Sequence, residues 1–227
     1  QVLFCIHETR RQDYAAYAAA VPGVDGLWKS QAREGNPAGH EDNHPVVGVS
    51  WEDAQAFSAW LSKTEGRKYR LPTDKEWSYA VGIGRDEKWT KDTTPEILNS
   101  KVPNEFPWDG DFPPKTRDKA GNYADASWHE KFSTQPWMED YTDGFATTAP
   151  VMSFKPNDFG IYDMGGNVLE WVEDWSNATQ RDRVMRGASF IHSSRDQLLS
   201  SIRFFRPPGD RNYNHHGFRI VVEMTAP

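Results

Sequence analysis

The feature that most constrains this fold is a long central segment without any periodic pattern. From about residue 86 to residue 156 the chain is rich in Pro, Gly, Asp, Thr and Trp, and its apolar residues follow neither a helical nor a strand period. So long an irregular segment is uncommon in a compact domain unless something holds it in place. The chain has one cysteine, which excludes an internal disulfide. Bound metal ions and buried aromatic rings are the remaining means, and ten tryptophans make rings plentiful.

The regular elements lie outside that segment and are short. Helix-start signals occur at residues 9–12, 50–53 and 73–76, where a hydroxyl residue precedes Gln, Asp or Glu by three positions. Gly66 is expected to end the second helix. We expect the third helix to pack Trp77 against the second. Strand-like runs occur at residues 2–6, 46–49 and 218–222. With no repeat and no low-complexity linker, residues 1–227 are expected to form a single domain of the α+β class.

Charge and composition narrow the range of partners that the chain is expected to bind. The formal net charge is −7, so binding to the phosphate backbone of nucleic acid is not expected. No stretch approaches the ~18 apolar residues that span a bilayer, so no membrane partner is expected. The N-terminal residues lack the charged region and cleavage site of a signal peptide, and the single Cys5 fits a reducing compartment, so a cytoplasmic location is favoured. The chain lacks an initiator Met, and fusion to an upstream effector domain stays open.

One string matches a zinc-protease motif but not its context. His40, Glu41 and His44 fit H-E-x-x-H, a motif that needs both histidines on one face of a helix. Pro45 follows His44 directly, and proline disfavours the helical conformation of the residue before it. We therefore expect a loop here and no protease site.

Two acid-rich loops have the composition of a calcium site. Asp163 and Glu170 flank Gly165 and Gly166, and a tight glycine turn exposes backbone carbonyls beside carboxylates. The loop at residues 139–145 has a similar character, with three acids before Gly144. On spacing alone, ordinary turns with solvated acids explain both loops equally well, and neither fits the EF-hand pattern.

Several motifs, in order along nearly the whole chain, make it similar to one family. They are residues 44–51 (HPVVGVSW), 69–77 (YRLPTDKEW), 143–145 (DGF), 160–171 (GIYDMGGNVLEW), 186–190 (RGASF) and 217–219 (GFR). The chain resembles the formylglycine-generating enzymes, also called sulfatase-modifying factors. The resemblance implies an elaborated C-type-lectin fold with little regular secondary structure and twisted antiparallel strands.

The resemblance also implies two structural calcium ions (Ca2+). The first would bind the side chains of Asn122 and Asp143 and the carbonyls of Tyr123 and Phe145. The second would bind the side chains of Asp163 and Glu170 and the carbonyls of Gly166 and Val168. All four side-chain positions hold an oxygen-bearing residue in this sequence.

The family's catalytic cysteine pair does not carry over. Counted from Ser189 and Phe190, the two positions hold His192 and Gln197, and the family tryptophan between the calcium residues is Leu169. In the family two thiolates hold a copper ion that activates oxygen, and a histidine with a glutamine lacks that soft ligand set. We expect no copper site, no catalytic residues and no cysteine-to-formylglycine oxidation.

Two hypotheses from different classes remain, of which we favour the first. It is a non-catalytic module that binds a protein or another ligand through a surface built from the C-terminal segments. Aromatic residues, arginine and small polar residues mix there as at interfaces. The positions are Ile191, His192, Ser193, Ser194, Phe204, Phe205, Arg206, Asn212, Tyr213, Asn214 and His215. We expect them on one exposed face, with Leu198, Leu199, Phe218 and Arg219 buried or paired between them.

The same stretch resembles the variable region of proteins diversified by retroelements. Those proteins share this fold and mutate the adenines of Asn codons, which yields every residue type except Met, Trp, Lys, Gln and Glu. All the positions named above hold permitted residues. The alternative hypothesis is an enzyme of oxidoreductase type, in which His192, His215 and His216 bind iron or zinc.

Overall fold

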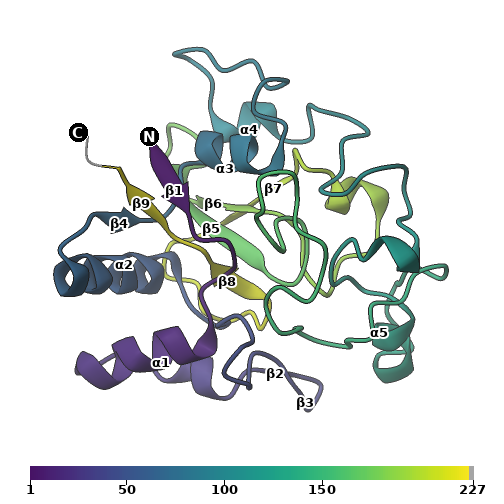
Figure 1. Cartoon of the computed structure of the whole chain (residues 1–227), viewed down its shortest axis with the longest axis horizontal. Helices are drawn as coiled ribbons and strands as arrows, with labels where there is room; N and C mark the ends of the chain where they lie inside the picture. Colours follow the sequence, from purple (N-terminus) through teal and green to yellow (C-terminus); the bar gives the residue numbers. More distant parts are fainter. Residues whose placement is uncertain (225–227) are drawn as a thin grey trace.

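The computed structural model describes residues 1–224, and its short elements surround one small central sheet (Figure 1). The strands are β1 (Val2–Phe4), β2 (Ala32–Arg33), β3 (Asn36–Pro37), β4 (Tyr69–Arg70), β5 (Leu169–Trp175), β6 (Arg183–Arg186), β7 (Arg203–Arg206), β8 (His216–Phe218) and β9 (Val221–Glu223). The α-helices are α1 (Arg11–Ala20), α2 (Trp51–Glu65), α3 (Asp74–Val81), α4 (Pro95–Leu98) and α5 (Ala126–Lys131). Three short 3₁₀ turns cover Leu27–Lys29, Thr116–Asp118 and Arg195–Leu198. Helices and strands together form the expected α+β fold.

The central sheet has the strand order β7-β6-β5-β8. β5 pairs antiparallel with β6 and parallel with β8, so Glu170 lies opposite both Arg186 and Gly217. A second sheet, β1-β9-β4, joins the N-terminal strand to the C-terminal one, and β2 and β3 form a separate hairpin. This arrangement brings the two ends of the described chain together (Figure 1).

The sequence patterns locate the flanking strands but not the central ones. β1 lies within the predicted run at residues 2–6. Residues 46–49 form no strand, although Val46 N–H donates to Thr9 O at 2.9 Å. The run at residues 218–222 is divided between β8 and β9 because Arg219 turns into the core, where it pairs with Glu170. β5, β6 and β7 were not predicted, since their charged and aromatic residues do not alternate like a half-buried strand.

Two of the three helix starts are confirmed. Ser50 and Thr73 cap α2 and α3 through their side-chain oxygens, and Gly66 ends α2 in the left-handed conformation, with φ 68°. The first helix differs by one residue, since Arg10 is its N-cap with Asp13 as partner, while Thr9 N–H donates to Phe218 O.

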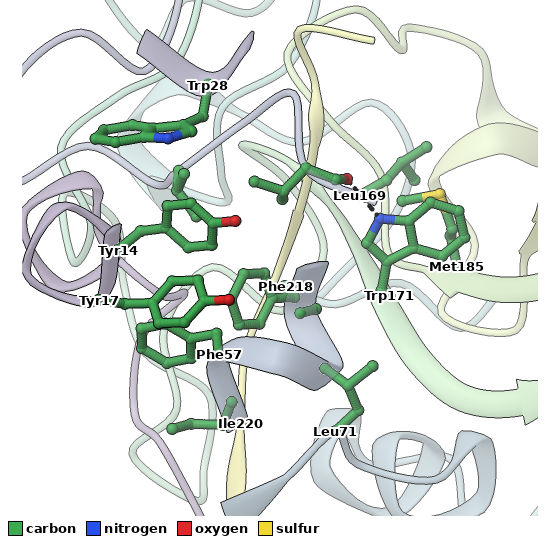
Figure 2. Close-up of a cluster of buried hydrophobic side chains, with 13 residues drawn as sticks. Tyr14, Tyr17, Trp28, Phe57, Leu71, Leu169, Trp171, Met185, Phe218 and Ile220 are labelled. Atoms are coloured by element: carbon green, nitrogen blue, oxygen red, sulfur yellow. Dashed lines mark hydrogen bonds between the residues drawn. The ribbon is translucent and has the colours of Figure 1, made fainter. Parts of the chain in front are cut away.

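The expected packing of the third helix was wrong. Trp77 is fully buried in a cluster with Val172 of β5 and Val184 of β6. Helix α3 therefore packs against the central sheet and not against α2. The largest core cluster lies under α1 and α2. Figure 2 shows the rings of Tyr14, Tyr17, Phe57 and Phe218 packed together, with Trp171 to the right of them in the same cluster. The Trp171 indole N–H donates to Val49 O at 3.0 Å, which ties the sheet to the chain before α2.

The long middle segment is as irregular as expected. Between residues 86 and 156 only α4, α5 and one 3₁₀ turn are regular. Buried rings hold much of this segment: Trp128 packs 4.3 Å from Phe132, and Phe106 stacks at 4.9 Å on Trp108. Buried aromatic rings, one of the two means expected to hold this segment, are therefore present.

Candidate functional site

Three C-terminal segments that are separate in sequence meet around His192. The backbone N–H of Ser189 donates to Nδ1 of His192 at 3.0 Å, so the neutral His192 ring carries its proton on Nε2. Its ring centroid lies 5.0 Å from that of Phe204 on β7 and 6.2 Å from that of His215. His192, where the resemblance places the family's first cysteine, is therefore a packed, neutral imidazole. Gln197, where it places the second, accepts a hydrogen bond from Ser194 Oγ at 2.8 Å.

His215 and His216 extend this group into what we call the histidine pocket, made of His192, His215 and His216. The Tyr213 ring stacks on His216 at 4.5 Å, and the Trp171 ring meets it edge-on at 5.8 Å. His216 is fully buried, and neither of its ring nitrogens has a hydrogen-bond partner within residues 1–224. Two free imidazole nitrogens in the interior are an unmet hydrogen-bonding requirement.

The three predicted segments meet around His192, but their residues are less exposed than expected, and the expectation of a single face was wrong for Phe205. Ser194 and Asn212 are exposed, whereas Ile191, Ser193, Phe204, Phe205, Arg206, Tyr213 and Asn214 are half-buried. His192 and His215 retain only 5% and 6% of their surface, so the expectation of exposure was wrong for these two. The prediction that Leu198, Leu199, Phe218 and Arg219 are buried is confirmed.

Phe204 and Phe205 lie on opposite faces of the sheet, since neighbouring side chains of a strand alternate. Phe204 packs against the cluster under α1 and α2, while Phe205 packs against the cluster that contains Trp77. Both rings are half-buried core residues. Only Phe204 shares the face of His192, so the aromatic character of the candidate surface rests on Phe204 and Tyr213.

Burial and neighbouring positive charges together lower the pKa of the three imidazoles. Burial, aided by Arg206, lowers the pKa of His192 to about 4 and that of His216 to about 3. Burial also lowers the pKa of His215, with contributions from His216, His192, Arg33 and Arg206. All three rings are therefore neutral at pH 7.

The geometry does not support the alternative metal hypothesis. Within the described part of the chain, no group of three or more His, Cys, Asp or Glu side chains is arranged to hold a metal ion. Arginine charge beside the imidazoles also opposes a bound cation. We therefore do not assign an iron or zinc site to His192, His215 and His216.

The first set of implied calcium ligands fits a cation. Tyr123 N–H donates to Asp143 Oδ2 at 2.8 Å, which brings its two loops together. Asn122 is fully buried, and its Oδ1 has no partner within residues 1–224. Burial and the nearby Asp125 carboxylate raise the pKa of Asp143 to about 8. An orphaned oxygen and two crowded carboxylates are the chemistry that a calcium ion would relieve.

The second set fits only in part. Asp163 is buried with φ 58°, and its Oδ1 lacks a partner within the described residues. Burial raises its pKa to about 6. The negative charge of Glu170 is already compensated by Arg219, whose Nε donates to Glu170 Oε2 at 2.7 Å. The Trp77 indole N–H donates to the same oxygen at 3.0 Å. A calcium ion here would have to share Glu170 with an arginine.

Sequence reasoning missed several residues that build these sites. Glu8 is fully buried and accepts from Asn167 Nδ2 at 2.8 Å, and Asn167 Oδ1 accepts from Asn122 Nδ2 at 3.0 Å. Asn167 thus links the two calcium-type loops. Its place after two glycines was a usable signal, since Asn tolerates the positive φ of 67° found here. Nothing in the local pattern around Glu8 or Arg33 marks either of them.

A cleft that was also not predicted lies elsewhere on the structure. It has a volume of about 790 Å³ and is lined by residues 81–83, 104–111, 117–120 and 155–159. Phe159 at its edge is 66% exposed. None of the predicted surface residues lines this cleft.

The fold defines an α+β domain of the formylglycine-generating-enzyme type. Residues 5–224 match the family described as the sulfatase-modifying factor enzyme 1-like domain, and the chain belongs to that family. A formylglycine-generating enzyme of Thermomonospora curvata is 32% identical over 229 residues, covering 92% of this chain and 65% of its own length. The inactive C-alpha-formylglycine-generating enzyme 2 of Bos taurus is 34% identical over 176 residues, covering 77% and 48%. The chain thus spans less than two thirds of these relatives.

Solved structures share the fold over nearly the whole chain. PvdO from Pseudomonas aeruginosa matches with a TM-score of 0.70 and 26% identity, covering 98% of this chain and 80% of its own. Treponema denticola variable protein 1 matches with a TM-score of 0.62 and 20% identity, covering 97% and 84%. At that identity the second likeness concerns the fold alone. Among the described residues, none of the helices has the length and apolar character needed to cross a bilayer.

Proposed function

We propose that this chain is a non-catalytic binding module whose ligand contacts the surface above the histidine pocket. The observation that carries the proposal is the replacement of the thiol pair by His192 and Gln197, around which three separate segments meet. One relative of similar sequence is named an inactive enzyme, which supports a non-catalytic role for this architecture. A structural neighbour titled a variable protein supports the further idea that these segments are diversified.

The contact surface in this proposal centres on Tyr213 and Arg206. Both are half-buried, and the Arg206 guanidinium carbon lies 5.3 Å from the centre of the Tyr213 ring. Tyrosine and arginine are enriched among residues that dominate binding energy, because each buries a large area with specific polar contacts. Ser194, Asn212 and Asn214 would form the polar rim.

Screening the purified chain against protein, glycan and small-molecule libraries, with matched variants, tests the proposal. We expect a ligand whose affinity falls at least roughly tenfold in Tyr213→Ser, since truncated interface anchors commonly cost more than ~1.4 kcal/mol. Phe159→Ser is the control, because that ring is exposed at the separate cleft. Ligands that lose affinity only in Phe159→Ser would move the function to the cleft and contradict the proposal.

We also propose that calcium stabilises the irregular middle segment at the first ligand set. Asn122 and Asp143 would supply side-chain oxygens, and Tyr123 and Phe145 their carbonyls. Calcium supplies the positive charge that these buried oxygens lack. The second set, Asp163 and Glu170 with the carbonyls of Gly166 and Val168, should bind more weakly because Arg219 already compensates Glu170.

A further inference from the structure

Two arginines lie near the loop that carries the end of the histidine pocket. Asn214 Nδ2 donates to Ala32 O at 2.8 Å, which places β2 against this loop, and the Arg33 guanidinium carbon lies 4.7 Å from the centre of the Trp128 ring. Arg206 at the end of β7 lies over the Tyr213 ring, and burial together with the charges of both arginines lowers the pKa of His215. The two guanidinium groups come from elements far apart in sequence, and we call them the arginine pair.

Neither member of the arginine pair has an acidic partner within residues 1–224. Arg211, on the same loop, is paired with Asp53 at 2.6 Å, so the chain does supply carboxylates to a neighbouring arginine. Arg33 and Arg206 make no such ion pair, and the Nε atom of each is buried without a hydrogen-bond partner in the described residues. A guanidinium nitrogen only donates, so each unmet Nε requires an acceptor.

The histidine pocket also contains ring nitrogens without a hydrogen-bond partner in the described residues. His216 is buried with both nitrogens unpartnered, and His192 Nδ1 accepts from Ser189, which leaves its proton on Nε2. The charges that lower the pKa of the three imidazoles come from Arg33, Arg206 and the imidazoles themselves. In a chain of net charge −7, no acidic side chain within residues 1–224 forms an ion pair with Arg33 or Arg206, and the Asp53 carboxylate is paired with Arg211.

We propose that the arginine pair and the histidine pocket bind an oxyanion, a carboxylate or phosphate group carried by the module's ligand. Arginine pairs with both groups through two parallel charge-assisted hydrogen bonds. An oxyanion supplies acceptors for the unpartnered Nε groups of Arg33 and Arg206, and its charge is opposite to that of the surrounding cations. The inference rests on the proposed binding function, to which it adds the chemistry that the ligand presents.

Small anions test this site without knowledge of the whole ligand. Isotope-labelled protein is titrated with sodium acetate and with sodium phosphate, against sodium chloride at equal ionic strength, and the arginine Nε–H and imidazole signals are followed by NMR. We expect saturable shifts at Arg33, Arg206 and His216 with one or both oxyanions. A tighter response to acetate assigns a carboxylate, and a tighter response to phosphate assigns a phosphate group. Bound anion should also raise the pKa of His192 above about 4.

Variants distinguish specific oxyanion binding at the arginine pair from general salt effects. Arg206→Gln and Arg33→Gln should each weaken oxyanion binding by roughly tenfold or more, because each removes a charge-assisted pair. Arg206→Lys keeps the charge without the planar fork and should bind with intermediate affinity. Arg181→Gln, whose side chain is 83% exposed, is the matched control and should bind like the wild type. Shifts no larger than those with chloride, or unchanged binding in Arg206→Gln, would overturn the oxyanion site.

This test can fail separately from the binding-module proposal. If a ligand found by screening depends on Tyr213 while neither oxyanion binds, the oxyanion site is wrong and the module stands. If oxyanions bind at the arginine pair but every ligand found by screening ignores Arg206 and Tyr213, the site stands and the proposed function is wrong.

Discussion

Acidification should expose the energetic cost of burying three neutral imidazoles. The pKa is lowered to about 4 for His192 and to about 3 for His216, and it is lowered for His215 as well. In the unfolded chain a histidine titrates near pH ~6.5, so the unfolded state takes up protons first as the pH falls. Their contribution to stability is therefore fully present above pH ~6.5 and is lost as the pH falls toward the folded-state pKa values.

The magnitude follows from the size of the shifts. A group that binds a proton only in the unfolded state costs ~1.4 kcal/mol of stability per pH unit, or about 2.7 kcal/mol between pH ~6.5 and pH ~4.5. Burial raises the pKa of Glu8, Asp143 and Asp163, so these carboxyls act in the opposite direction in the absence of metal. The total pH dependence is thus a difference of large contributions. One histidine is isolated by comparing a variant with the wild type.

The assay is urea unfolding of wild type, His216→Phe and the exposed control His40→Gln at pH ~7, ~6, ~5 and ~4.5, the interval over which ~1.4 kcal/mol per unit accumulates. His216→Phe keeps the aromatic packing between Tyr213 and Trp171 and removes both unpartnered nitrogens. Its stability relative to wild type should rise by about 2–3 kcal/mol from pH ~7 to pH ~4.5. A difference that does not change with pH, or a His40→Gln variant that behaves the same way, would refute the reasoning.

Three further outcomes are expected. Removal of calcium with a chelator should lower the melting temperature by about 5–10 °C if the ion was present at ~100 times its Kd, and Asp143→Asn should abolish this shift while Asp109→Asn does not. Equal chelator effects in both variants would place any calcium elsewhere. The chain should not convert a sulfatase-type cysteine peptide to formylglycine with copper and oxygen, because His192 and Gln197 lack the thiolates; measurable turnover by mass spectrometry would contradict this. Gly165→Ala should destabilise the fold by ~1–3 kcal/mol, because an added Cβ would lie 1.8 Å from Pro107 Cγ, and chemical denaturation at unchanged m-value checks it.

Local chemistry made part of this fold readable from sequence. The capping residues Ser50 and Thr73 act through atoms only three residues away, so their pattern is visible in the chain itself. The central sheet was not readable in the same way. β5 carries Glu170, Glu173 and Asp174 among its apolar residues, and Glu170 is tolerated in the interior only because Arg219, from a distant strand, pairs with it.

The candidate site was likewise predictable from the sequence only in part. The meeting of the C-terminal segments was predicted from the resemblance to a fold that presents a surface built from its final strands and loops. The burial of His192 and His215, and the packing of Phe204 and Phe205 against core clusters on opposite faces of the sheet, depend on contacts across the sheet that no local pattern contains. Arg33 joins the site from a hairpin more than a hundred residues away in sequence, held by Asn214, and its position follows only from the folded structure.

Hydrogen–deuterium exchange with and without a ligand found by screening tests the central claim most directly, since it maps the contact surface on the intact chain. The account predicts slowed exchange in the peptides that cover residues 191–194, 204–206 and 212–215, together with residues 32–33 of the β2 hairpin. Protection confined to residues 104–111 and 155–159 at the separate cleft, with the C-terminal segments unchanged, would contradict it.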